Sequence, residues 1–172
     1  PRVGEKDGAK RLGEWTPSED RKLLAYSFQE GGPDWLILGV IEAATGKLLD
    51  DELKWLKYSG DVSWAKDGSG FYYSRFPAPA DGKTFQQSTL DHRNYFHNLG
   101  TAQSADRLIY ATPKEPKLLH FAELTEDGRY LVISTSEAGN ENDVAVIDLK
   151  KKGASPRPIF TGLKNQWSFI GN

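Results

Sequence analysis

The stretch SWAKDGSGFYYS (residues 63–74) places a short polar centre, Asp67-Gly68, before a run of large apolar residues. Asp-Gly suits a two-residue type I′ hairpin turn, because both central residues of that turn need a positive φ, which glycine adopts freely and aspartate tolerates. The apolar run is typical of a β-strand that packs in a core. The stretch therefore predicts a strand end, a tight turn and a second strand.

The same pattern occurs twice more, in PSEDRKLLAYS (residues 17–27) and LTEDGRYLVIS (residues 124–134). Asp20, Asp67 and Asp127 take equivalent places in the three copies, 47 and 60 residues apart. Each copy is followed by a third apolar run and then by a fourth, more polar one. The third runs are residues 35–41, 95–99 and 144–149, and the fourth runs are residues 52–56, 107–111 and 157–160.

Four short strands in each unit of about 45 to 60 residues are typical of β-propeller blades. A β-sandwich also has short strands and regular turns, but it does not predict the same Asp-centred turn in every repeat. Pro158 fits an outer strand, because an edge strand tolerates a residue without an N–H. We therefore expect an all-β chain that forms part of a propeller, with about three four-stranded antiparallel blades.

These patterns predict blades at about residues 12–57, 58–117 and 118–163, after a lead-in of residues 1–11. Residues 164–172 resemble the innermost strand of a further blade, with Trp167 aligned to Trp64. The sequence contains no methionine and ends where the next hairpin turn is due. We therefore expect a fragment of a longer protein.

Composition narrows the classes of function. The chain has 172 residues, a net charge of −2 and no cysteine. The absence of cysteine excludes disulfides, thiolate catalysis and cysteine-ligated zinc. The small net charge disfavours nucleic-acid or anionic-membrane partners. Lys150–Lys152 is expected to form a solvated turn. No phosphate-binding glycine motif and no membrane-length apolar run occurs, so we expect no cofactor and a soluble protein, cytoplasmic or periplasmic.

The chain also lacks the pattern of a serine nucleophile. No Gly-x-Ser-x-Gly elbow occurs, so we expect no catalytic residue here. His92, His97 and His120 are expected to be structural or surface residues rather than metal ligands, and we expect no metal site. The acidic run 50–52 is expected on a solvated outer turn. The five tryptophans (Trp15, Trp35, Trp55, Trp64 and Trp167) are expected in the core between blades.

Several stretches, taken in order, resemble the propeller of the prolyl oligopeptidase family. They are WAKDGSGFYYSRFP (64–77) and HRNYFHNLGTAQSAD (92–106), with SFQEGGPDW (27–35) upstream and EPK (115–117) and AELTEDGRY (122–130) downstream. The second stretch is similar to the family's pattern of histidine, x, leucine-glycine-threonine, x, glutamine, x, x, aspartate. Single motifs of this kind are weak, but their succession from about Gly13 to Phe160 is specific.

The resemblance implies a serine peptidase that cleaves short peptides after proline. An α/β-hydrolase domain, missing from this chain, would supply serine, aspartate and histidine, and the propeller would admit only small or unfolded substrates. Family residues that line the substrate cavity fall at Tyr58 (or Ser59, if the gap at Gly60 is placed differently), at Leu119 and in the turn from Ser136 to Gly139. Leu119 stands for a methionine and Gly139 for a cysteine. For Tyr58, packing between blades is the alternative role.

Two other functions remain open from the sequence. One is the related oligopeptidase that cleaves after basic residues and shares the Leu-Gly-Thr turn, although the run FYYSRFP (71–77) favours proline specificity. The other is a propeller scaffold that binds proteins and catalyses nothing. A three-blade piece would also leave apolar blade faces open, so we expect the chain by itself to self-associate.

Overall fold

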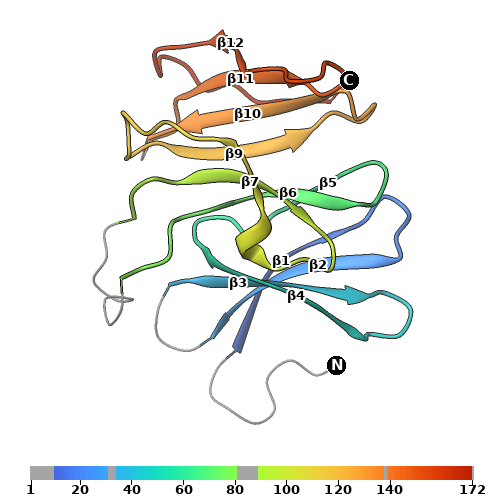
Figure 1. The fold of residues 1–172 in the computed structure, drawn as a ribbon. Coiled ribbons are helices and arrows are strands. Elements are labelled where there is room, and N and C mark those ends of the chain that lie inside the picture. Colours follow the sequence, from blue (N-terminus) through green and yellow to red (C-terminus); the bar gives the residue numbers. More distant parts are fainter. Residues whose placement is uncertain (1–9, 31–33, 81–88, 138, 172) are drawn as a thin grey trace.

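The computed structural model describes residues 10–30, 34–80, 89–137 and 139–171, and these form three four-stranded antiparallel sheets. In each sheet the strands pair in chain order. Figure 1 shows the sheets one above another, and the three predicted blades are thereby confirmed. None of the described residues forms a helix long and apolar enough to cross a membrane.

The strands have the following bounds. Blade 1 consists of β1 (Lys10–Pro17), β2 (Leu23–Glu30), β3 (Leu36–Glu42) and β4 (Leu48–Leu56). Blade 2 consists of β5 (Ser63–Trp64), β6 (Gly70–Arg75), β7 (Arg93–Asn98) and β8 (Arg107–Tyr110), with a 3-10 turn, η1 (Gln103–Ala105), before β8. Blade 3 consists of β9 (Leu119–Leu124), β10 (Tyr130–Ser136), β11 (Asn142–Asp148) and β12 (Arg157–Phe160).

The Asp-centred turns join the first two strands of each blade, but the predicted two-residue type I′ geometry is wrong. In blade 2 the N–H of Ala65 donates to the carbonyl of Gly70, which closes a four-residue loop. Gly68 has a φ of 70°, whereas Asp67 is not among the residues with positive φ. The Asp67 carboxylate instead accepts the N–H of Ser69 at 3.0 Å, so aspartate is used for its side chain rather than for a left-handed backbone.

The same loop recurs in the other two blades. Asp20 accepts the N–H of Lys22 at 3.1 Å, and Asp127 accepts the N–H of Arg129 at 2.9 Å. The left-handed position belongs to Gly128 in blade 3, but to Arg21, with a φ of 58°, in blade 1. A residue with a Cβ is strained there, so the blade 1 turn is the least favourable of the three.

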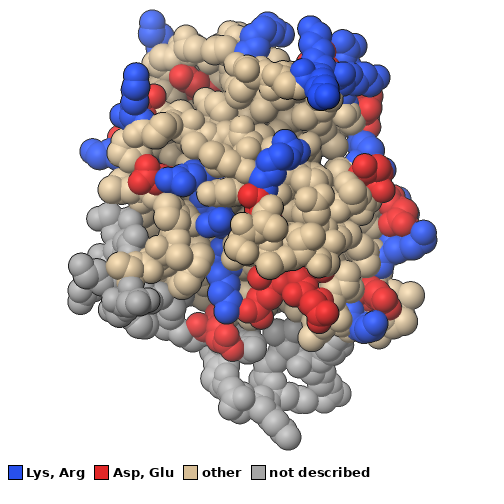
Figure 2. Space-filling model, in the orientation of Figure 1, with Lys and Arg blue, Asp and Glu red and all other residues tan. Residues whose placement is uncertain are grey.

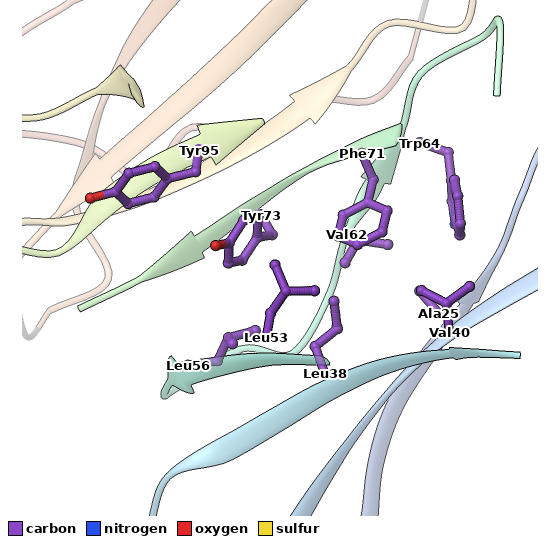
Figure 3. Close-up of a cluster of buried hydrophobic side chains, with 10 residues drawn as sticks. All are labelled: Ala25, Leu38, Val40, Leu53, Leu56, Val62, Trp64, Phe71, Tyr73 and Tyr95. Carbon is purple, nitrogen blue, oxygen red and sulfur yellow. The ribbon is translucent and has the colours of Figure 1, made fainter. Parts of the chain in front are cut away.

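Apolar side chains from adjacent blades meet between the sheets. Trp64 also donates its indole N–H to the carbonyl of Thr16 in blade 1 at 3.1 Å. Figure 3 shows the cluster between blades 1 and 2, which comprises Ala25, Leu38, Val40, Leu53, Leu56, Val62, Trp64, Phe71, Tyr73 and Tyr95. A second cluster joins blades 2 and 3 through Tyr72, Phe96, Leu131, Ile133 and Ile147.

The prediction that all five tryptophans are core residues is partly wrong. Trp35 and Trp64 are buried, but Trp15 on β1 is 61% exposed and Trp167 is 38% exposed. Residues 162–171 form no strand in the structure. Instead, Trp167 stacks on Phe160 at 3.8 Å between ring centroids, and Asn142 accepts its backbone N–H at 2.7 Å. An inner strand needs a partner strand, so the first strand of a further blade stays a prediction.

His97 joins blades 1 and 2 through two buried carboxylates. Its Nε2 lies 2.9 Å from Asp51 Oδ1, and its Nδ1 lies 2.7 Å from Asp106 Oδ1. Burial would lower the pKa of His97, but the hydrogen bonds to Asp106 and Asp51 outweigh burial and raise that pKa. Asp51, expected on a solvated turn, lies inside β4 and is 3% exposed, because its charge is paired with His97 and it accepts the N–H of Gly100.

Two further side chains extend this network, Tyr73 of β6 and Gln103 of the histidine-to-aspartate motif. Tyr73 donates its hydroxyl to the second carboxylate oxygen of Asp106 at 2.5 Å. The Gln103 side chain bonds the backbone of Lys54 in β4 in both directions, accepting its N–H and donating to its carbonyl. The motif is therefore a set of contacts that fastens blade 2 to blade 1.

The turns give a matched pair of expected stability changes. Gly68→Ala should lower the free energy of unfolding by about 1 kcal/mol, because alanine resists the left-handed backbone. Arg21→Gly at the equivalent position should raise it by about 0.5 kcal/mol, since relief of strain exceeds the extra entropy of an unfolded glycine. Urea denaturation of the 172-residue chain measures both values. If both substitutions raised the free energy of unfolding, or both lowered it, the shared turn geometry would be contradicted.

Candidate functional site

All the residues expected to line a substrate cavity lie at one end of the three sheets, where strands begin or end. Because the strands are antiparallel, β6 and β10 end at the edge where β5, β7 and β9 begin. We call this edge the rim. It is defined by Tyr58, Phe76, His92, Leu119 and Ser136, together with the loop from Ser136 to Gly139.

Two of the expected residues are direct neighbours in the blade 3 sheet. Leu119, the first residue of β9, is the register partner of Ser136, the last residue of β10. Both side chains are half-buried. Gly139 lies in the loop that follows, where its N–H donates to the carbonyl of Glu137 at 2.7 Å. Ala138 lies outside the described residues.

Tyr58 lies apart from this pair, at the entry to blade 2. Its side chain is 58% exposed, so more than half of its surface lies outside any contact between blades. The edge of its ring contacts Phe76 at 6.0 Å between centroids, and its hydroxyl bonds Thr89 Oγ1 at 3.1 Å. The alternative residue, Ser59, contacts Glu14 of blade 1 and accepts the N–H of Asp61.

The backbone near Tyr58 is unusual. Tyr58 has a φ of 72° and Trp55 a φ of 70°, in a region where bulky residues are rare. The carbonyl of Trp55 accepts the N–H of Phe76 at 3.0 Å, which ties this strained segment to the end of β6. Strain of this kind gathers at functional sites, where the surrounding structure holds it in place.

Two buried histidines, His92 of the rim and its neighbour His120, were not expected from the sequence to belong to a site. His92 and His120 are 1% and 0% exposed. The backbone N–H of His120 donates to His92 Nδ1 at 2.9 Å, and the ring of His92 lies 4.5 Å from that of Phe76. His92 is the first residue of the motif 92–106, and the sequence predicts for it only a structural or surface role.

Burial keeps both histidines neutral. Burial, with a smaller contribution from nearby His120, lowers the pKa of His92 to about 3. Burial also lowers the pKa of His120 to about 4. Since His92 Nδ1 accepts a hydrogen bond, the ring proton is on Nε2, which has no partner among the described residues.

The rim offers binding surface rather than reactive groups. Its side chains are aromatic rings, an aliphatic chain, hydroxyls and the exposed carboxylate of Glu137, and no three acidic or histidine side chains in the described ranges form a metal cluster. Figure 2 shows basic and acidic side chains scattered over one face of the molecule with uncharged surface between them. Apolar surface with a few placed polar groups suits peptide binding.

Comparison with known proteins gives a consistent result. A family model described as the prolyl oligopeptidase N-terminal β-propeller domain matches residues 4–172. A prolyl endopeptidase of Elizabethkingia miricola is 41% identical over 148 residues, which cover 86% of this chain and 21% of that protein. A prolyl endopeptidase of Elizabethkingia meningoseptica is 44% identical over 140 residues, covering 81% of this chain and 19% of that protein.

Solved structures agree. One from a study of two prolyl endopeptidases and their inter-domain dynamics has a TM-score of 0.83 and 37% identity, covering 95% of this chain and 23% of that one. Prolyl oligopeptidase B from Galerina marginata, bound to a 35mer hydrolysis and macrocyclization substrate, has a TM-score of 0.89 and 26% identity, covering 100% of this chain and 26% of that one. The chain spans about a fifth to a quarter of these relatives.

The two neutral histidines predict a loss of stability in mild acid. Because their folded pKa values lie below the unfolded value of 6.5, the unfolded chain binds more protons, and the free energy of unfolding falls as pH drops from about 6.5 toward 4. Each histidine contributes at most about 1.4 kcal/mol per pH unit. His97 has the opposite sign, and its contribution is complete below pH 6.5.

Urea denaturation between pH 6.5 and 4.5 measures this slope. His92→Asn removes one titrating group and should make the slope shallower. His97→Gln should lower stability at every pH in this window, because the buried carboxylates of Asp51 and Asp106 lose their partner. An unaltered slope in His92→Asn would contradict the neutral state assigned to His92.

Proposed function

Because this chain belongs to the family of prolyl oligopeptidase N-terminal β-propeller domains, we propose that it works as part of a serine peptidase that hydrolyses short peptides after proline. The curated relatives named above are prolyl endopeptidases, which supports this reaction class. Serine, aspartate and histidine of the catalytic triad would come from an α/β-hydrolase domain outside these residues, since the chain has no nucleophile elbow. The 172-residue chain by itself is then inactive.

We assign the rim to the face of the propeller that meets the substrate. In this proposal Tyr58, Leu119, Ser136 and Gly139 line outer subsites, and the blades restrict access to small or unfolded peptides. The observation that carries the proposal is the composition of the rim: the Leu119–Ser136 pair and the exposed ring of Tyr58 lie on one edge. Prolyl oligopeptidase B from Galerina marginata, in which this fold recurs, holds a 35mer peptide.

Kinetics of the complete peptidase test the role of the rim. Tyr58→Ala and Leu119→Ala should each lower kcat/KM about tenfold for a substrate with apolar residues upstream of the proline, because each removes buried apolar contact. A substrate that carries little beyond proline should be unaffected. Leu108→Ala is the matched control, since Leu108 is an exposed leucine on β8. An equal loss on both substrates would overturn the subsite assignment, and absence of proline-specific hydrolysis would overturn the function.

We also propose that the 172-residue chain self-associates through blade 3. Val132, Val144, Ile159 and Phe160 line a concave region of about 1110 Å³, and Ile159 and Phe160 are more than a third exposed. Exposed apolar surface of this kind recruits a partner, which here is a second copy of the chain. Sedimentation equilibrium at micromolar concentration should show species heavier than 19.2 kDa, and Ile159→Lys should reduce them. A single species at the monomer mass would contradict this proposal.

A further inference from the structure

We propose that His92 is the positioning residue of the rim, holding the Leu119–Ser136 pair of blade 3 at a fixed place relative to Tyr58 of blade 2. The inference rests on the proposed function, in which these residues meet the substrate. His92 itself does not reach the substrate, because it is 1% exposed. It acts through Phe76 on the blade 2 side and through the backbone of His120 on the blade 3 side.

On the blade 2 side, the ring of His92 packs against Phe76, and Phe76 in turn contacts Tyr58. The centroids of His92 and Phe76 are 4.5 Å apart, and the Phe76 ring meets Tyr58 edge to face. Phe76 is 2% exposed, so its ring has no free space to move into. A smaller side chain at position 92 would leave a cavity beside Phe76 and loosen the base on which Tyr58 rests.

On the blade 3 side, His92 bonds directly to the peptide unit that joins Leu119 to His120. The N–H of that unit donates to His92 Nδ1 at 2.9 Å. The carbonyl of His120 accepts the Ser74 hydroxyl at 2.7 Å, so blade 2 holds this residue at both backbone groups. The ring of His120 bonds Thr135 Oγ1 at 3.0 Å, next to Ser136.

A directional bond is needed here because β9 is the edge strand of its sheet. The outward N–H groups of an edge strand have no backbone partner. Blade 2 side chains supply partners at both ends of β9: His92 for His120, and Ser63 for Leu124 at 2.8 Å. Packing alone could hold the blades together, but it would not fix how far β9 slides along blade 2. The bond at His92 sets this register beside Leu119.

Two substitutions separate the hydrogen bond from the bulk of the side chain. His92→Asn places an amide oxygen where Nδ1 lies and keeps the acceptor. His92→Gln places its polar atoms one bond further out and leaves the N–H of His120 unpaired. A residue that only filled space would tolerate glutamine, the larger side chain, at least as well as asparagine.

The experiment measures KM and kcat of the complete peptidase with the extended and the minimal proline substrates. His92→Gln should raise KM for the extended substrate about fivefold, the loss expected for one hydrogen bond. It should leave kcat and the minimal substrate within twofold, and His92→Asn should remain near the parent. Thr135→Val removes the hydroxyl beside His120 and should also raise KM for the extended substrate. This variant replaces His92→Gln in the test if His92→Gln does not fold.

His97→Gln is the control for lost stability, since it removes an equally buried histidine near the other end of β7 and should lower the melting temperature without the selective rise in KM. ¹⁵N chemical shifts of the His92 ring in the 172-residue chain test the bond without any peptidase activity, and should show the proton on Nε2. Equal KM values for His92→Gln and the parent, a parallel loss on both substrates, or a proton on Nδ1 would overturn the inference. Absence of hydrolysis in the parent would overturn only the proposed function.

Discussion

The contact between blades 1 and 2 combines an apolar cluster with one buried network, the ring of His97 between the carboxylates of Asp51 and Asp106. A buried ion pair stabilises a fold only where each partner is also hydrogen-bonded, because desolvation opposes it. This requirement accounts for the N–H of Gly100 on Asp51 and the hydroxyl of Tyr73 on Asp106. A separate, steric constraint applies to Gly70 on the neighbouring strand, where a Cβ would lie 1.9 Å from the carbonyl oxygen of His97.

Local patterns in the sequence were sufficient for the blades but not for their contacts. The Asp-centred repeat marked the first hairpin of each blade, because turn chemistry is set within a few residues. The turn type was wrong because Asp67 acts through its carboxylate. The burial of Asp51 was missed for another reason: strand alternation gives the face on which a side chain lies, and only the fold brings His97, 46 residues away, to that face.

The candidate site, too, could be predicted from the sequence only in part. Tyr58, Leu119, Ser136 and Gly139 were named through resemblance to a family, and the structure places them along one edge. His92 and His120 could not be found in this way, because their bond joins residues 28 apart in different blades. Their low pKa values follow from burial, which depends on the packing of Phe76 and Phe121 around His92 and of Tyr110 against His120.

The connections between the second and third strands of the blades differ in length. Those of blades 1 and 3 have five residues each (31–35 and 137–141), whereas that of blade 2 has seventeen (76–92). All three leave the sheets at the rim, away from the Asp-centred turns and from the ion pair of His97. A chain of this architecture can therefore vary the length of these connections without disturbing the ion pair that joins blades 1 and 2. The connections that differ in length and the ion pair of His97 thus lie at opposite ends of the same sheets.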